Sequence, residues 1–226
     1  KLIETYPADG YAYTNEIEFT VSPDGTIDKV KMEDKLTHVE ITKTDITTGE
    51  ELPGARLQII DKSDAENPII VDEWISGTTP HIIKGKLIAG KTYVLHEEIT
   101  PDGYTFAEDI EFTVSKDGSI DKVTMEDKPT HVEVSKKDIT NDEELPGAHI
   151  QIIDKEGNVV EEWTSTDKPH VIIGKLVAGE EYTMHEEGAP DGYGYSIDIK
   201  FTVSKDGSVD KVKMKDKPTH VEITKS

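Results

Sequence analysis

One motif recurs three times in this sequence at almost constant spacing, and this repetition constrains the fold more than any other feature. A segment in which apolar and polar residues alternate begins at Glu16, Asp109 and Asp198, so the period is 93 residues (109−16) and then 89 residues (198−109). The tripeptides Asp-Gly-Tyr and His-Val-Glu recur with matching offsets. Self-similarity at this period indicates that the chain of 226 residues is an array of similar domains rather than one large domain.

The repeat positions predict two complete domains flanked by two partial ones. We expect the complete repeats at 38–130 and 131–219, the C-terminal part of a truncated repeat at 1–37, and the first strand of a following repeat at 220–226. The parent protein is therefore expected to continue on both sides. The junction Lys128-Pro129-Thr130 is short and should leave little room for bending.

Within each repeat, apolar and polar residues alternate as they do in β-strands. Runs such as 55–59 and 148–152 have a period of two and are separated by Gly, Pro, Asn and Asp. The Asp-Gly pairs that begin at Asp24, Asp117 and Asp206 are expected in short hairpin turns. Several short strands in a repeat of this length are typical of an antiparallel sandwich. The predicted fold class is all-β, with tandem immunoglobulin-like sandwiches arranged end to end.

The charge of the chain excludes some partners. Its formal net charge is −22, with 25 Lys and Arg against 47 Asp and Glu, which argues against nucleic acid and anionic membrane surfaces as partners. We interpret the acidity as a solvated, mutually repelling surface. Calcium binding is the alternative, but it needs carboxylates at spacings that the Asp-Gly turns do not supply. The chain has no cysteine, so it can form neither a disulfide nor a thiolate nucleophile.

Three charged residues in each complete repeat continue rows of apolar residues that should face the core. A lysine follows Val39 and Ile41 on the first strand, a glutamate follows Tyr93 and Leu95, and an aspartate ends the last strand. These residues are Lys43, Glu97 and Asp127 in the first complete repeat and Lys136, Glu186 and Asp216 in the second. Isolated buried charges are costly, so the residues of each set should contact one another. Burial alone leaves open whether they form an ion cluster or a covalent bond.

The pattern ITKTD…ELPGA…LHEEITPDGY…MEDKP resembles the B-type repeats of Gram-positive collagen adhesins (Cna B-type) and the SpaA-like domains of pilins, which have a prealbumin (transthyretin-like) fold. The resemblance covers essentially the whole chain. It implies an autocatalytic isopeptide bond between Lys43 and Asp127, assisted by Glu97, and a second bond between Lys136 and Asp216, assisted by Glu186. Incomplete sets would remain in the partial repeats, and they comprise Glu4, Asp34 and Lys225.

The acceptor departs from the more frequent residue of that family, because it is Asp rather than Asn at all three aligned positions. Condensation with Asp releases water instead of ammonia, and it requires a neutral amine and a protonated carboxyl group. Burial favours both neutral forms. The glutamate would relay a proton and polarise the carbonyl group.

The leading hypothesis is a structural stalk or spacer on a bacterial cell surface, anchored to the cell wall through the parent protein. Its partners would be neighbouring repeats, and host matrix or glycan would be contacted through other domains. The alternative is a host protein- or glycan-binding adhesive module without cross-links. The chain is not expected to turn over a substrate, and we expect neither a cofactor nor a metal site. The segment that begins with His96 and Glu97 lacks the second histidine of a zinc hydrolase motif. A glycosidase pair would need a sugar-binding cleft.

Overall fold

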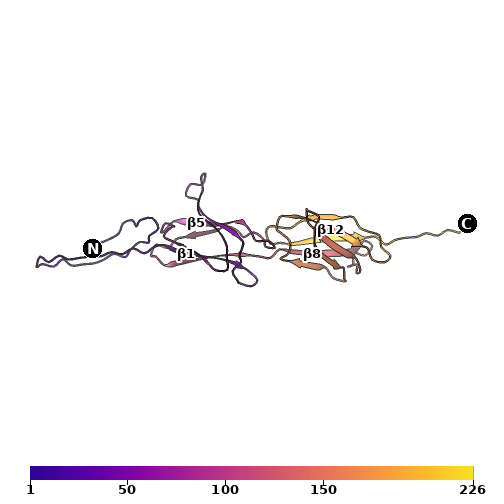
Figure 1. Cartoon of the computed structure of the whole chain (residues 1–226), viewed down its shortest axis with the longest axis horizontal. Helices are drawn as coiled ribbons and strands as arrows, with labels where there is room; N and C mark the ends of the chain where they lie inside the picture. Colours follow the sequence, from indigo (N-terminus) through magenta and orange to yellow (C-terminus); the bar gives the residue numbers. More distant parts are fainter. Residues whose placement is uncertain (226) are drawn as a thin grey trace. The chain divides into compact units, whose positions relative to one another are not determined.

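The computed structural model describes residues 1–225, which form fourteen strands and no helix (Figure 1). None of these residues therefore belongs to an apolar helix that could cross a membrane. The chain divides into two compact units. The first contains Lys1–Thr100 and Ala107–Asp127, and the second contains Pro101–Phe106 and the chain from Lys128 onward.

The first unit is a sandwich of two sheets. One sheet has three strands in the order β4-β1-β7, and the other has four in the order β3-β2-β5-β6. In Figure 1, β1 and β5 lie in opposite layers of this unit. The strand bounds are β1 His38–Asp45, β2 Arg56–Asp61, β3 Ile69–Ile75, β4 His81–Lys84, β5 Thr92–Ile99, β6 Ile110–Thr113 and β7 Ile120–Asp127.

The second unit repeats this architecture with the sheets β11-β8-β14 and β10-β9-β12-β13. Its strand bounds are β8 His131–Asp138, β9 His149–Ile153, β10 Val159–Thr164, β11 His170–Ile173, β12 Glu181–Gly188, β13 Ile199–Thr202 and β14 Val209–Asp216. The predicted all-β class with tandem sandwiches is confirmed.

The core of each unit lies between its two sheets and is built from the inward rows of alternating residues. In the first unit, Val39 and Ile41 of β1 pack with Leu95 of β5 and Met125 of β7, and each is nearly inaccessible to solvent. The second unit has a matching cluster that includes Val132, Val134, Met184 and Met214. Burial of this apolar surface drives the two sheets together.

The first and last strands of each unit pair in parallel, whereas the other pairings are antiparallel. In the first unit, Lys43 lies opposite Met125 and Asp45 opposite Asp127. The alternation of residues predicted an antiparallel sandwich and gave no sign of this parallel pair. The pair arises because the chain enters along β1 and leaves along β7 in the same direction.

The Asp-Gly turns differ from the expected hairpins. The turn at Asp117-Gly118 connects β6 to β7, which belong to different sheets, and the turn at Asp206-Gly207 does the same for β13 and β14. The local chemistry is as expected: Asp117 Oδ1 accepts a hydrogen bond of 3.0 Å from the backbone N–H of Ser119, and Gly118 has a φ of 72°. A turn motif sets the local reversal, but sandwich packing decides which strands pair. Among residues 1–225, no group of three or more His, Asp or Glu is placed to hold a metal ion.

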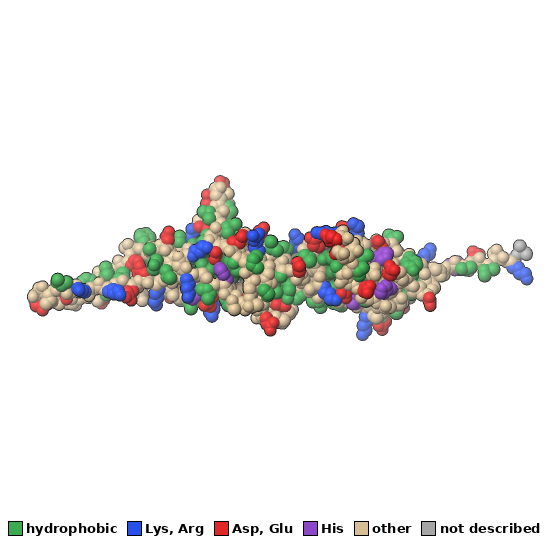
Figure 2. All heavy atoms as spheres, viewed as in Figure 1, with side chains coloured by type: hydrophobic (Ala, Val, Ile, Leu, Met, Phe, Trp, Pro, Cys, Tyr) green, Lys and Arg blue, Asp and Glu red, His purple; other side chains and the backbone are tan. Residues whose placement is uncertain are grey.

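The surface carries the negative charge of the chain. Figure 2 shows acidic side chains spread over the visible face of both units, with basic side chains among them. Many basic side chains form exposed ion pairs, such as Lys155 with Glu180 at 2.8 Å and Lys200 with Glu181 at 2.7 Å. Exposed pairs of this kind contribute little stability. The folded state therefore depends on the two cores and on what they enclose.

Candidate functional site: a buried lysine, glutamate and aspartate in each unit

The first unit encloses three ionisable side chains from three strands. Lys43 of β1 is 2% exposed, Glu97 of β5 is 3% exposed and Asp127 at the end of β7 is 1% exposed. The Lys43 Nζ atom contacts Asp127 Oδ1 directly and lies 3.0 Å from Glu97 Oε1. These residues are far apart in sequence, and the fold brings all three together.

The second unit repeats the arrangement. Lys136 Nζ contacts Asp216 Oδ1 and lies 2.8 Å from Glu186 Oε1, and all three side chains are buried. The lysine and aspartate come from the paired parallel strands β8 and β14, whereas the glutamate comes from β12 in the facing sheet. The amine therefore lies between two carboxyl groups inside the sandwich.

A backbone N–H group orients each glutamate. Glu97 Oε2 accepts a hydrogen bond of 2.9 Å from Ala107 N, and Glu186 Oε2 accepts one of 2.7 Å from Ser196 N. Both donors lie ten residues after the glutamate, in the segment that leads to the next strand. Because this bond holds Oε2, the other oxygen, Oε1, faces the lysine. A backbone donor leaves no signature in residue types, so this hydrogen bond could not be predicted from the sequence.

The buried surroundings favour a proton on the carboxyl groups. Burial raises the pKa of Glu97 to about 7, although the Ala107 N–H group and the Lys43 charge oppose the shift. Burial also raises the pKa of Asp216 to about 6, against the hydrogen bond from Lys136, and the neighbouring Glu186 raises it further. Two carboxyl groups beside one amine can therefore share a proton near neutral pH. Each site thus places a carboxyl group with a raised pKa beside a buried amine.

The predicted residues of the partial repeats are less enclosed. Glu4 is half-buried and accepts a hydrogen bond of 2.9 Å from Thr14 N, as its counterparts do from their backbone donors. Asp34 is exposed and accepts a hydrogen bond of 2.8 Å from Thr14 Oγ1. Thr14 thus brings Glu4 and Asp34 together. Lys225 is exposed.

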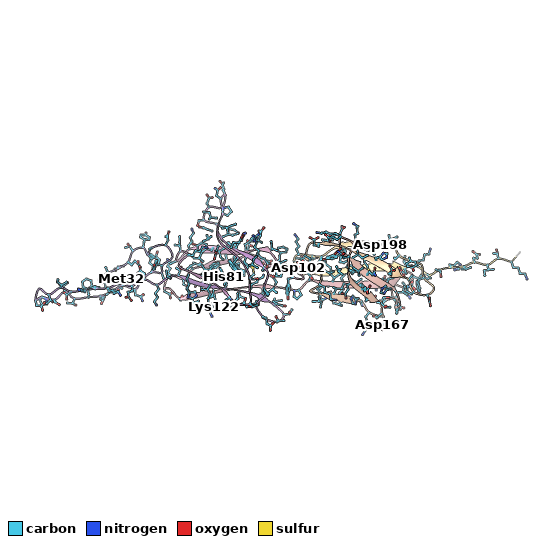
Figure 3. All side chains as sticks on the ribbon, viewed as in Figure 1. Met32, His81, Asp102, Lys122, Asp167 and Asp198 are labelled. Carbon is cyan, nitrogen blue, oxygen red and sulfur yellow. The ribbon has the colours of Figure 1, made fainter. Side chains whose placement is uncertain are left out.

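An aromatic stack lies beside the first site. Trp74 of β3 packs against the core and stacks on His81 of β4 with ring centroids 4.1 Å apart, and His81 is labelled in Figure 3. Trp163 and His170 form the same stack in the second unit. A pocket of about 200 Å³ is lined by Lys43, Trp74 and His81 together with neighbouring residues. Both Trp residues therefore pack against the cores of their units.

The two sites differ at one residue, Thr100, that was not among the predicted site residues. Thr100, which directly follows β5, donates a hydrogen bond of 3.2 Å from Oγ1 to Asp127 Oδ2. The aligned residue of the second repeat is Ala189. Comparison of the residue three positions after each glutamate would have revealed the difference, but not its contact with Asp127.

A comparison with family models identified one match in each unit. The model described as SpaA, prealbumin-like fold domain, matches residues 37–129 and again residues 130–218. Each match begins and ends one residue before the expected complete repeat. A comparison with curated proteins found no match.

Solved structures with a similar fold include two pilins and a Bacillus anthracis protein. The Bacillus anthracis TIE protein is 24% identical over 92% of this chain with a TM-score of 0.49, and this chain spans 40% of its length. The shaft pilin SpaA from Lactobacillus rhamnosus GG is 15% identical over 83% of this chain and 99% of its own, with a TM-score of 0.38. A streptococcal ancillary pilin is 18% identical over 89% of this chain and 70% of its own, with a TM-score of 0.39.

Proposed function

Because the chain belongs to the family of SpaA prealbumin-like fold domains, we propose that it is a stalk segment of a bacterial surface pilus or adhesin. Each of the two units is stiffened by an autocatalytic isopeptide bond. One observation supports this proposal above all others: in both units, a buried lysine amine contacts a buried aspartate carboxyl group beside a second carboxyl group. Complete burial is costly for an ion cluster, and a neutral amide bond would remove two of the buried charges.

The reaction condenses an amine with a carboxylic acid. The proton that the two carboxyl groups share starts on Asp127, and Glu97 starts ionised. The neutral Lys43 Nζ attacks the Asp127 carboxyl carbon, and Glu97 accepts a proton from the amine. Glu97 then returns that proton to the departing oxygen, so the C–N bond forms, a C–O bond breaks and one molecule of water leaves. Glu97 ends in its starting protonation state and does not enter the product. Lys136, Glu186 and Asp216 take the same roles in the second unit.

The fold provides three conditions for this condensation that aqueous solution does not provide: positioning, a raised pKa and exclusion of water. It holds the amine against the carboxyl group, and intramolecular positioning of this kind can supply about 7–11 kcal/mol of a reaction barrier. The raised pKa of Glu97, about 7, lets this carboxyl group both accept and return a proton near neutral pH. Exclusion of water also favours condensation over hydrolysis. Each bond forms once, so the chain is not an enzyme that turns over a substrate.

Each bond would join the first and last strands of its unit, so a cross-linked unit can bear tension along the stalk. Force enters a unit near His38, passes along β1 to Lys43, and can cross directly to Asp127, where β7 ends. Residues 44–126 then carry almost no tension. The stalk would be located at the cell surface, attached to the cell wall through the parent protein. Neighbouring repeats of the same protein are its expected partners.

Mass spectrometry of the intact, folded chain tests the proposal. We expect a mass below the sequence mass by one water for each bond, and digestion should yield Lys43–Asp127 and Lys136–Asp216 cross-linked peptides. Lys136→Met should restore one water. Lys137→Met is the matched control, because Lys137 is the next residue on β8 and pairs with Glu144 rather than with the buried set. An intact mass equal to the sequence mass would refute the cross-links.

A further inference from the structure

The two buried sites differ at one acceptor oxygen. In the first unit, Asp127 Oδ2 accepts the hydrogen bond from Thr100 Oγ1 at 3.2 Å. In the second unit, Asp216 Oδ2 is buried and has no hydrogen-bond donor among the residues that the structure describes.

The difference arises from a single side chain at equivalent positions. Thr100 directly follows β5 and Ala189 directly follows β12, each three residues after the glutamate of its site. Thr100 is 8% exposed, so its hydroxyl group bonds to Asp127 with little competition from water. Alanine has no polar atom in its side chain and cannot make this bond. The chain thus contains two versions of one site, with and without a hydroxyl donor.

We propose that Thr100 is a catalytic residue for formation of the Lys43–Asp127 bond and that the second unit lacks this contribution. The inference rests on the proposed isopeptide function. As Lys43 Nζ adds to the Asp127 carboxyl carbon, negative charge develops on Oδ2, and the Thr100 hydroxyl group stabilises it by hydrogen bonding. Oδ1, which faces the amine, leaves as water with the proton relayed by Glu97. Oδ2 remains as the amide oxygen, and Thr100 keeps its own proton throughout.

The expected size of the effect follows from the kind of donor. A neutral hydroxyl group at 3.2 Å makes an ordinary hydrogen bond rather than a charge-assisted one. Its loss should slow bond formation on the order of tenfold. This is smaller than the effect of losing Glu97, which moves the proton. Thr100 therefore changes the rate of cross-linking, not whether the bond forms.

A time course on the full chain tests this role. The chain is made by cell-free synthesis at pH 9, where few molecules hold the shared proton and the chemistry is slow. A brief protease pulse removes unfolded chains, and acid denaturant then stops each sample. Digestion and mass spectrometry measure the Lys43–Asp127 and Lys136–Asp216 peptides separately. The rate of bond formation in the unsubstituted unit is therefore an internal reference for the rate in the substituted unit.

Matched substitutions in both units distinguish the hydroxyl group from the shape of the side chain. Thr100→Val should slow the first bond about tenfold, and Thr100→Ser should restore most of the rate. Ala189→Thr should accelerate the second bond, whereas Ala189→Val should not. Bonds that form at equal rates in the natural chain and in Thr100→Val would overturn the role of Thr100 but leave the stalk function intact. Absence of both cross-linked peptides from every variant would refute the proposed function itself.

Discussion

Replacement of Glu97 by Gln should leave a folded first unit without its cross-link. Gln retains an oxygen that can accept the Ala107 N–H bond, which is 2.9 Å long in the natural chain, but it cannot relay a proton. Lys43 and Asp127 would remain as a buried ion pair. The substitution therefore removes the covalent bond with little change in packing.

The stability loss can be estimated from the loop that the bond closes. Lys43 and Asp127 are 84 residues apart, and a cross-link over that separation lowers the entropy of the unfolded chain by an amount worth about 4.5 kcal/mol at 25 °C. For a domain of this size, 1 kcal/mol shifts the Tm by about 4–8 °C. The first unit of Glu97→Gln should therefore melt about 20–35 °C below its natural temperature.

Scanning calorimetry of the full chain measures this shift, with the intact second unit as an internal reference. Glu98→Gln is the matched control, because Glu98 is the next residue of β5 and its side chain is 50% exposed. The mass of each variant should be measured on the same sample. A Glu97→Gln protein that regains one water in mass but melts within a few degrees of the natural protein would refute the loop-entropy argument. Retention of the full mass deficit would refute the role of Glu97.

Two further predictions concern pH and force. Bond formation needs one carboxyl proton, and the pKa is about 7 for Glu97 and about 6 for Asp216, so the rate should fall as pH rises, above about 7 in the first unit and above about 6 in the second. Time courses at a series of pH values test whether the rate in the second unit falls at a lower pH than the rate in the first unit. Rates that rise with pH would contradict this prediction. Under single-molecule stretching, a Lys43→Ala, Lys136→Ala double variant should lengthen by whole-unit steps, whereas the natural chain should stretch without releasing residues 44–126. Equal full-unit steps in both proteins would show that the bonds bear no load.

The sequence was informative about the fold because its signals are local and repeated. Period-two alternation placed Val39, Ile41 and Lys43 on one face of a strand, and the same row recurs at Val132 and Val134 before Lys136. Repetition made a chance pattern improbable. The boundaries of the repeats and the roles of the buried residues stay predictions, because burial and contact do not by themselves demonstrate a bond.

Other features escaped the sequence because they depend on which strands become neighbours. The hairpin expected at Asp117-Gly118 was wrong, since a local turn motif does not specify the partner of the strand that follows. The Ala107 N–H donor is a backbone group that every non-proline residue has. Thr100 is an ordinary residue in sequence until the fold brings Asp127 to it.

The sequence by itself determined the repeat, the all-β class and the identity of the three charged residues that face each core, because these follow from alternation along single strands. Only the tertiary structure decided that β1 and β7 run in parallel and that Lys43 reaches Asp127 across 84 residues. It also placed Glu97 from the opposite sheet beside that pair and enclosed all three side chains. The physical reason is that contact, desolvation and the raised pKa of Glu97 arise only when two sheets close over side chains that no local pattern connects.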